Sequence, residues 1–260
     1  MEVKIDFTKT PQENAGDYYS VAKKLAQKRA GIEKTISELE ARLEKIPQTK
    51  GETEKKPLLK QKREWYEKFH WFFTGDGHLA IGGRDAKQNE QLNSKYFNNG
   101  DLFFHANVFG ASVVVLKDGI SSSDSSKAET AQFAASYSSA WKKGMNSVDV
   151  YAMERAQVSK STGKGSLGTG SFLLSGERKW YRNTPLGLIA VNDSGKFKVF
   201  PDREANFVSA SLRGAKIAEI KLGKTKKSYA AKMLAEMLGI EDVDEIMQQL
   251  PAGEFYISFL

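Results

Sequence analysis

The stretch from residue 71 to residue 116 constrains the fold most, because it places two strand patterns around a turn bounded by glycines. Residues 71–74 and 79–81 are short aromatic and aliphatic runs. Between them stands Gly75-Asp76-Gly77, in which two glycines supply the positive φ that a tight turn needs. The stretch therefore predicts a β-hairpin at the centre of the domain.

A second turn follows directly after this hairpin. Gly82 and Gly83 let the backbone bend sharply at the end of the second strand, so that Arg84 and Asp85 are presented at its exit. Asn89 follows at a spacing that the first turn of a helix would place on the same face as residues 84–86. We interpret Gly82, Gly83, Asp85 and Asn89 as a structural turn that presents Arg84.

The rest of the chain alternates strand and helix patterns. Strands are predicted at residues 2–8, 101–108, 113–116, 148–153, 171–174, 180–182 and 186–191, and helices at 88–99, 127–143, 228–238 and 242–249. Ser126 is the expected cap of the helix at 127–143. Residues 171–182 are interpreted as a second hairpin with a basic turn. The pattern indicates an α+β fold, with a mixed or antiparallel sheet and packed helices, preceded by a long coiled-coil-type helix.

Near the N-terminus, Pro11 opens a long helix whose apolar residues recur at alternating steps of four and three. The seam consists of Tyr18, Ala22, Leu25, Ile32, Ile36, Leu39, Leu43 and Ile46, with Arg29 as its one polar interruption. A seam this narrow needs a partner helix, so the arm is expected to be exposed, self-associated or folded back. An amphipathic helix packed on the domain is the competing interpretation.

Three regions are expected from these patterns. Residues 1–57 hold a short strand, the coiled-coil arm and a polar linker, and residues 58–195 hold the α+β core. Residues 196–260 form a basic strand and helix extension packed on that core. No apolar run approaches the roughly 20 residues that cross a bilayer, so we expect a cytoplasmic protein without a membrane partner.

Composition narrows the function. The chain has no cysteine and three histidines, which excludes disulfides, thiol catalysis and cysteine-ligated zinc and leaves little for a histidine-rich metal site. HExxH, GxSxG and P-loop spacings are missing. We therefore predict a protein that binds without catalysing, with no cofactor and no metal.

The net charge of +7 favours a polyanionic partner, RNA above all. The glycine- and hydroxyl-rich run at 161–171 could hold phosphate oxygens, although a flexible hairpin tip is an alternative. For the late lysines the alternative is a solvated basic face, and for His105 a structural hydrogen-bonding role. The candidate nucleic-acid contacts are Arg84, Lys87, His105, Lys160, Lys164, Arg178, Lys179, Lys224, Lys226 and Lys227.

Several motifs together resemble one family. They are I-G-G-R-D-A-x-x-N-E from Ile81, G-D-L-F-F-H-A-N-x-x-G-A from Gly100, Q-V-S-K from Gln157 and T-G-S-F from Thr169. This set is similar to the NFACT-R domain of the NFACT family of ribosome quality-control factors, in its archaeal form, and the resemblance covers essentially the whole chain. It implies a module that binds the large ribosomal subunit and tRNA in the rescue of stalled nascent chains. It also implies that the N-terminal helix is the second arm of an antiparallel coiled coil.

The resemblance has departures that matter. Family members begin with an NFACT-N domain and a helix-hairpin-helix module, which do not precede Met1, so an NFACT-N domain in cis or in trans is an expected partner. An alternative function is a protein-interaction scaffold that completes a separate NFACT-N subunit, and a third is an enzyme acting at the glycine-glycine turn. Asn107 and Phe109 replace an acidic residue and a second histidine, which removes support for a metal or acid–base role there.

Overall fold

The computed structural model describes residues 5–44, 64–162, 165–203 and 215–259, and the chain divides into two compact units, Met1–Gln61 and Lys62–Leu260. The first unit contains α1 (Pro11–Glu44). Thr10 and Glu13 bond reciprocally across its first turn, because the Glu13 carboxylate accepts from the Thr10 N–H at 2.7 Å and the Thr10 hydroxyl accepts from the Glu13 N–H at 3.3 Å. Proline at the first helical position completes this start.

The long N-terminal helix agrees with the predicted coiled-coil-type arm. Tyr18, Leu25, Ile32 and Ile36 are 48–60% exposed along it. The side chains at 39 and 43, and residue 46, lie outside the described residues. The strand predicted at 2–8 is wrong for the part that is described, because residues 5–8 form a turn closed by the Lys9 N–H on the Asp6 carbonyl.

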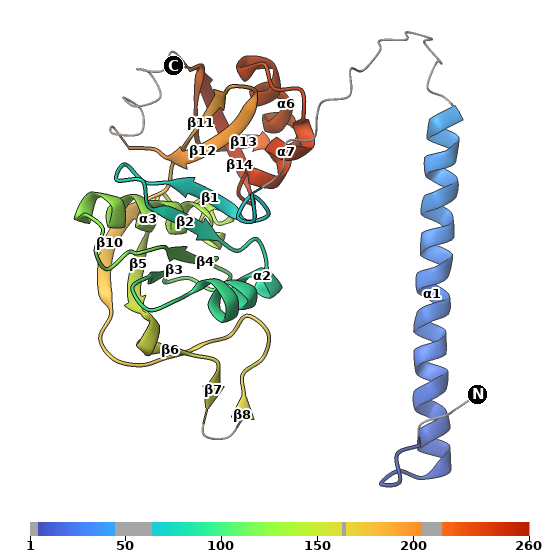
Figure 1. Ribbon diagram of the computed structural model, residues 1–260. Coiled ribbons are helices and arrows are strands. Elements are labelled where there is room, and N and C mark those ends of the chain that lie inside the picture. Colours follow the sequence, from blue (N-terminus) through green and yellow to red (C-terminus); the bar gives the residue numbers. More distant parts are fainter. Residues whose placement is uncertain (1–4, 45–63, 163–164, 204–214, 260) are drawn as a thin grey trace. The chain divides into compact units, whose positions relative to one another are not determined.

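A six-stranded antiparallel sheet forms the centre of the second unit (Figure 1), in the order β1–β2–β4–β3–β5–β10. Its strands are β1 (His70–Phe73), β2 (Leu79–Gly82), β3 (Leu102–Ala106), β4 (Val113–Leu116), β5 (Ser147–Glu154) and β10 (Lys179–Pro185). The first two form the predicted hairpin, with Trp71 opposite Ile81. β10 is an edge strand.

Both faces of this sheet are covered by other elements. Successive residues of a strand point to opposite sides, so each strand contributes to both layers of packing. In β3, Phe104 packs on the side of α3 (Asp124–Ser136), whereas Phe103 packs on the side of Leu92 in the π-helical turn η1 (Leu92–Tyr96). Helix α2 (Ala86–Gln91) leads into η1. The predicted helix at 88–99 is therefore two short helical segments that end earlier than expected.

A second, four-stranded antiparallel sheet has the order β12–β11–β13–β14. It consists of β11 (Leu188–Asp193), β12 (Lys196–Pro201), β13 (Ile217–Lys226) and β14 (Glu254–Phe259), covered by α6 (Lys227–Leu238) and α7 (Val243–Gln249). Apolar side chains of both sheets, α3 and α6 belong to one continuous core. Figure 1 shows the two sheets next to each other with α3 beside the first.

Two local predictions are corrected. Residues 171–182 do not form a hairpin, because β9 (Leu173–Leu174) pairs with β6 (Val158–Ser159) whereas β10 pairs with β5. The short pair β7 (Ser161–Thr162) and β8 (Gly165–Ser166) lies between β6 and β9, and the 3-10 turn η2 (Arg155–Gln157) precedes β6. The turn at Gly176, with a φ of 84°, redirects the chain to the sheet edge.

The helix predicted at 127–143 is interrupted. Ser123, rather than Ser126, caps α3, and the helix ends at Ser136. Ser138 then donates its hydroxyl to the Ala135 carbonyl at 2.7 Å and accepts from the Ala140 N–H, which starts α4 (Ser139–Lys142). Across the described ranges, no helix combines the length and the apolar character that crossing a bilayer requires.

Candidate nucleic-acid interface

A row of ring side chains crosses three strands of the first sheet on the face opposite α3. The register places His105 of β3 opposite Tyr151 of β5, and Tyr151 opposite Trp180 of β10. Tyr151 and Trp180 meet edge to face with ring centroids 5.4 Å apart. Since antiparallel neighbours share a face, this row ends at the open edge of the sheet.

Two arginines flank the end of this row. Arg178, Trp180 and Arg182 alternate along the edge and lie on one face, and we call them the arginine–tryptophan strip. The Arg178 guanidinium lies 4.6 Å from the Tyr151 ring centre and 5.8 Å from that of Trp180, and the Arg182 guanidinium lies 4.0 Å from the Trp180 ring. Stacking on these rings restricts the orientation of the guanidinium planes.

The strip keeps positive charge at the surface. Arg182 pairs with Asp149 at 2.7 Å and also remains exposed, whereas Arg178 forms no ion pair with any residue in the described ranges. The N–H groups of a guanidinium match the spacing of phosphate oxygens, and a base can stack on the face of an indole ring. The strip therefore has the chemistry of a single-stranded nucleic-acid contact.

His105, the first residue of this row, contacts Tyr151. Its Nδ1 lies 3.2 Å from the Tyr151 hydroxyl, and burial together with the nearby Arg178 lowers the pKa of His105 to about 4. The imidazole is consequently neutral at pH 7. It orients Tyr151 and carries no charge toward a phosphate.

The remaining predicted contacts fall in different places. Lys160 pairs with Glu90 at 3.1 Å and donates to the Gly168 carbonyl at 2.8 Å, and Lys164 lies outside the described residues. Lys179 points to the other face of β10 and pairs with Asp124 at 3.3 Å. Lys87, Lys224 and Lys226 are exposed on α2 and on the end of β13.

The residues of the structural turn are held by hydrogen bonds within the turn and to Val113. The Asp85 carboxylate accepts from the Gln88 N–H at 2.8 Å and caps α2. Buried Asn89 accepts from the Val113 N–H at 3.1 Å through its side-chain oxygen, while the Gly83 N–H donates to the Val113 carbonyl. Gly82 is the last residue of β2 and is buried.

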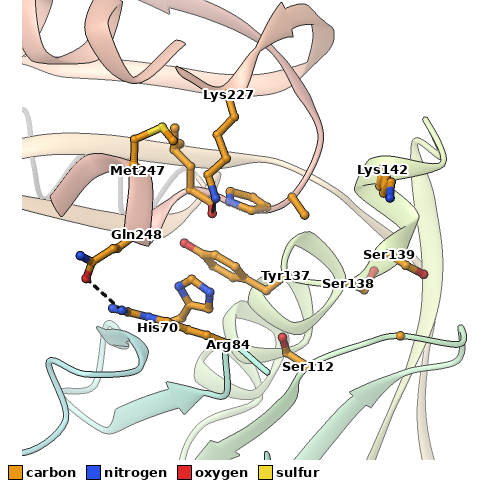
Figure 2. A pocket seen from close by; sticks show the side chains of 14 residues that line it. His70, Arg84, Ser112, Tyr137, Ser138, Ser139, Lys142, Lys227, Met247 and Gln248 are labelled. Carbon is orange, nitrogen blue, oxygen red and sulfur yellow. Dashed lines mark hydrogen bonds between the residues drawn. The ribbon is translucent and has the colours of Figure 1, made fainter. Parts of the chain in front are cut away.

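This turn directs Arg84 into the domain, away from the arginine–tryptophan strip. Its guanidinium donates to the Phe69 carbonyl at 3.2 Å and to the Gln248 side chain at 3.1 Å. A pocket of about 380 Å³ opens beside it, between the first sheet and the helices α6 and α7. In Figure 2, Arg84 and His70 lie together, Lys227 reaches toward them, and Lys142 stands at the other end.

The pocket is cationic. Arg84, Lys142 and Lys227 line it, and the lining, which falls wholly within the described ranges, contains no carboxylate. Burial, and then the charge of Arg84, lower the pKa of Lys227, whose ammonium donates to the Leu250 carbonyl at 2.8 Å. Burial and Arg84 also lower the pKa of His70 to about 3. The His70 ring stacks on Tyr137 with centroids 4.0 Å apart.

Sequence reasoning missed part of both sites. Tyr151, Trp180 and Arg182 were not proposed as contacts, although the alternation of Arg178, Trp180 and Arg182 places them on one strand face. His70 and the other pocket residues come from segments far apart in the chain, and no local pattern joins them. In the parts of the chain that the structure describes, no three His, Cys, Asp or Glu side chains gather as metal ligands do.

Comparison with known proteins identifies a domain within this fold. Residues 68–176 match the family model described as NFACT protein RNA binding domain. The chain is 35% identical to the archaeal Rqc2 homolog aRqcH of Methanocaldococcus jannaschii, over 78% of this chain and 31% of that protein. It is 32% identical to the human ribosome quality control complex subunit NEMF, over 72% of this chain and 18% of that protein. The chain thus spans a third or less of these relatives.

Among solved structures, the C-terminal part of the fibronectin/fibrinogen-binding protein from Streptococcus suis is similar. It matches with a TM-score of 0.40 and 31% identity, over 48% of this chain and 49% of that one.

Proposed function

We propose, because this chain belongs to the NFACT family, that it is an RNA- and ribosome-binding module of a ribosome quality-control factor. The observation that carries the proposal is the match of residues 68–176 to an RNA-binding domain. The partners that we propose are the RNA of the large ribosomal subunit and tRNA, bound during the rescue of stalled nascent chains. The role is binding, without catalysis.

The arginine–tryptophan strip supports a specific mode of binding. It lies directly after the matched region, and it continues the row of His105 and Tyr151, which belong to that region. A base that stacks on the exposed part of Trp180 would place its phosphates near the two guanidinium groups. The exposed lysines at 87, 224 and 226 add long-range attraction.

Binding of a fluorescein-labelled single-stranded RNA and of tRNA, followed by anisotropy, tests the strip. Stacking of one base contributes about 1–3 kcal/mol, so Trp180→Ala should weaken binding by roughly 5- to 150-fold. Arg178→Ala with Arg182→Ala should weaken binding and make the salt dependence shallower by about two phosphate contacts.

The matched control removes the same charge elsewhere. Lys143→Ala with Lys232→Ala alters two exposed cations outside the strip. If this control weakens RNA binding as much as the double arginine variant does, general charge accounts for the attraction and the strip is not the contact. Unchanged binding by Trp180→Ala would also refute the assignment.

A second candidate function rests on α1. Leu25 and Ile32 are each 60% exposed on a heptad seam, so we propose as the alternative a scaffold that completes a separate NFACT-N subunit through this arm. Heptad pairing is apolar and persists at high salt, whereas binding through several cations weakens steeply. A partner retained at 0.5 M salt but lost on Leu25→Asp would favour the scaffold; loss of the partner to salt alone would exclude it.

A further inference from the structure

The pocket between the first sheet and α6–α7 lies away from the arginine–tryptophan strip and has a chemistry of its own. We propose that it binds the phosphate group of a nucleotide, with the sugar and base against its apolar wall. The nucleotide is either free or the phosphorylated end of an RNA. This inference goes beyond the proposed function, because such a site stands whether or not the strip binds RNA.

Charge is the first argument. Arg84 and Lys227 are partly buried and face the same space, and the lining residues, all of them described, include no carboxylate. Two cations in a partly desolvated site repel each other, and burial, followed by the charge of Arg84, lowers the pKa of Lys227. An anion between them replaces the repulsion with two attractions. An arginine fork beside a lysine is a pairing that suits phosphate oxygens.

Hydrogen bonding is the second argument. His70 is 7% exposed, lines the pocket, and its Nδ1 has no hydrogen-bond partner among the described residues. Buried polar atoms are nearly always paired, so this nitrogen is available to a bound group. In Figure 2 the imidazole lies between Arg84 and Tyr137, and the Ser112 hydroxyl lies nearby. A phosphate there would meet the Arg84 guanidinium and the Ser112 hydroxyl as donors.

Size and shape are the third argument. A volume of about 380 Å³ is within the range of small-molecule sites and exceeds what one phosphate fills. Met247, Leu250 and Pro251 add apolar groups to the lining, next to Lys227. A ligand with one anionic group and one flat, weakly polar body suits a lining of cationic and apolar side chains, and a nucleotide has that form.

Calorimetric titration of the 260-residue chain with adenosine 5′-monophosphate, adenosine and inorganic phosphate tests the proposal. The monophosphate should bind saturably, and at least 10-fold more tightly than either of the other two. Lys227→Met should weaken its binding at least 10-fold. Lys226→Met, which removes the same charge from the adjacent exposed residue outside the lining, should change it less than 2-fold.

A second pair protects the test against misfolding. Lys142 and Lys143 are neighbouring exposed residues, and only Lys142 lines the pocket. Lys142→Gln should weaken binding of the monophosphate 3- to 10-fold, and Lys143→Gln should leave it unchanged. Equal effects within each pair, equal affinity for adenosine and its monophosphate, or no binding at millimolar concentration would overturn the proposal.

The source of the nucleotide is separated by an RNA arm. An oligoribonucleotide with a 5′-phosphate is compared with the same oligomer lacking it, in the parent and in Lys227→Met. A terminal phosphate that adds 10-fold affinity only in the parent assigns the pocket to an RNA end. If the terminal phosphate adds nothing while the free monophosphate still binds, the ligand is a free nucleotide. The arginine–tryptophan strip is the same in the parent and in Lys227→Met. The comparison therefore tests the pocket even if the strip does not bind RNA.

Discussion

Gly83→Ala should destabilise the domain more than a methyl group added at any other position of the turn. A Cβ at Gly83 would lie 2.2 Å from the side-chain oxygen of Asn89 and 2.8 Å from its backbone nitrogen. At neighbouring Gly82 the nearest atom, a methyl carbon of Val114, would be 3.3 Å away. The two glycines therefore offer a matched pair within one turn.

The magnitude follows from what Asn89 must give up. If its side chain withdraws, the buried Val113 N–H loses its acceptor, which costs about 1–3 kcal/mol. Displacing the backbone of the first turn of α2 adds about 1–3 kcal/mol of overpacking. We expect Gly83→Ala to lower the free energy of unfolding by about 2–5 kcal/mol, and Gly82→Ala to lower it by about 1 kcal/mol.

Urea unfolding followed by circular dichroism measures both variants, and a double-mutant cycle identifies the cause. In Asn89→Ala the 2.2 Å conflict is gone, so Gly83→Ala should cost less in that background than in the parent. A loss of less than 1 kcal/mol for Gly83→Ala, or strict additivity with Asn89→Ala, would refute the reasoning.

Three further predictions concern other parts of the chain. His70 has a pKa of about 3 when folded against 6.5 unfolded, so stability is lost as the pH falls from 6.5 toward 3, by at most about 5 kcal/mol, and His70→Gln should flatten the urea midpoint over that range. Asp101→Ala should cost about 3–5 kcal/mol in urea unfolding, because buried Asp101 binds the Lys117 ammonium and the N–H groups of Asn98 and Asp118. Leu25→Asp should abolish any self-association of α1 in sedimentation velocity, and association that survives would place it elsewhere.

Local chemistry made the first hairpin predictable. Gly75 and Gly77 flank its turn, and the strands on either side of it pair as expected, with Trp71 opposite Ile81. The N-terminal cap of α3 was harder to predict. Serine is a favoured capping residue, and the chain has serines at both Ser123 and Ser126; the structure shows that Ser123 is the cap. The helix is interrupted at Ser138 because its hydroxyl donates to the carbonyl of Ala135, three residues earlier. Such a side-chain bond competes with helix continuation, and the spacing of apolar residues does not reveal it.

Pairing between distant strands was not predictable in the same way. The basic turn before Trp180 resembled a hairpin, yet β10 pairs with β5, about 30 residues earlier in the chain. That pairing decides which side chains share a face with Tyr151, so it also decides where the arginine–tryptophan strip lies. The pocket depends on still more distant packing, between Arg84 and Gln248, for which the sequence has no periodic signal.

The continuous core shared by the two sheets has a consequence for how the domain can be divided. The match to the family model ends at residue 176, but Leu188, Phe197, Ile220 and Leu234 complete the same apolar interior. A chain cut at that boundary would lose the contacts of α3 with β10 and β12, and β5 would lose its neighbour β10. The region matched by the family model is therefore shorter than the part of the chain that builds this core, and a fragment cut at residue 176 should aggregate.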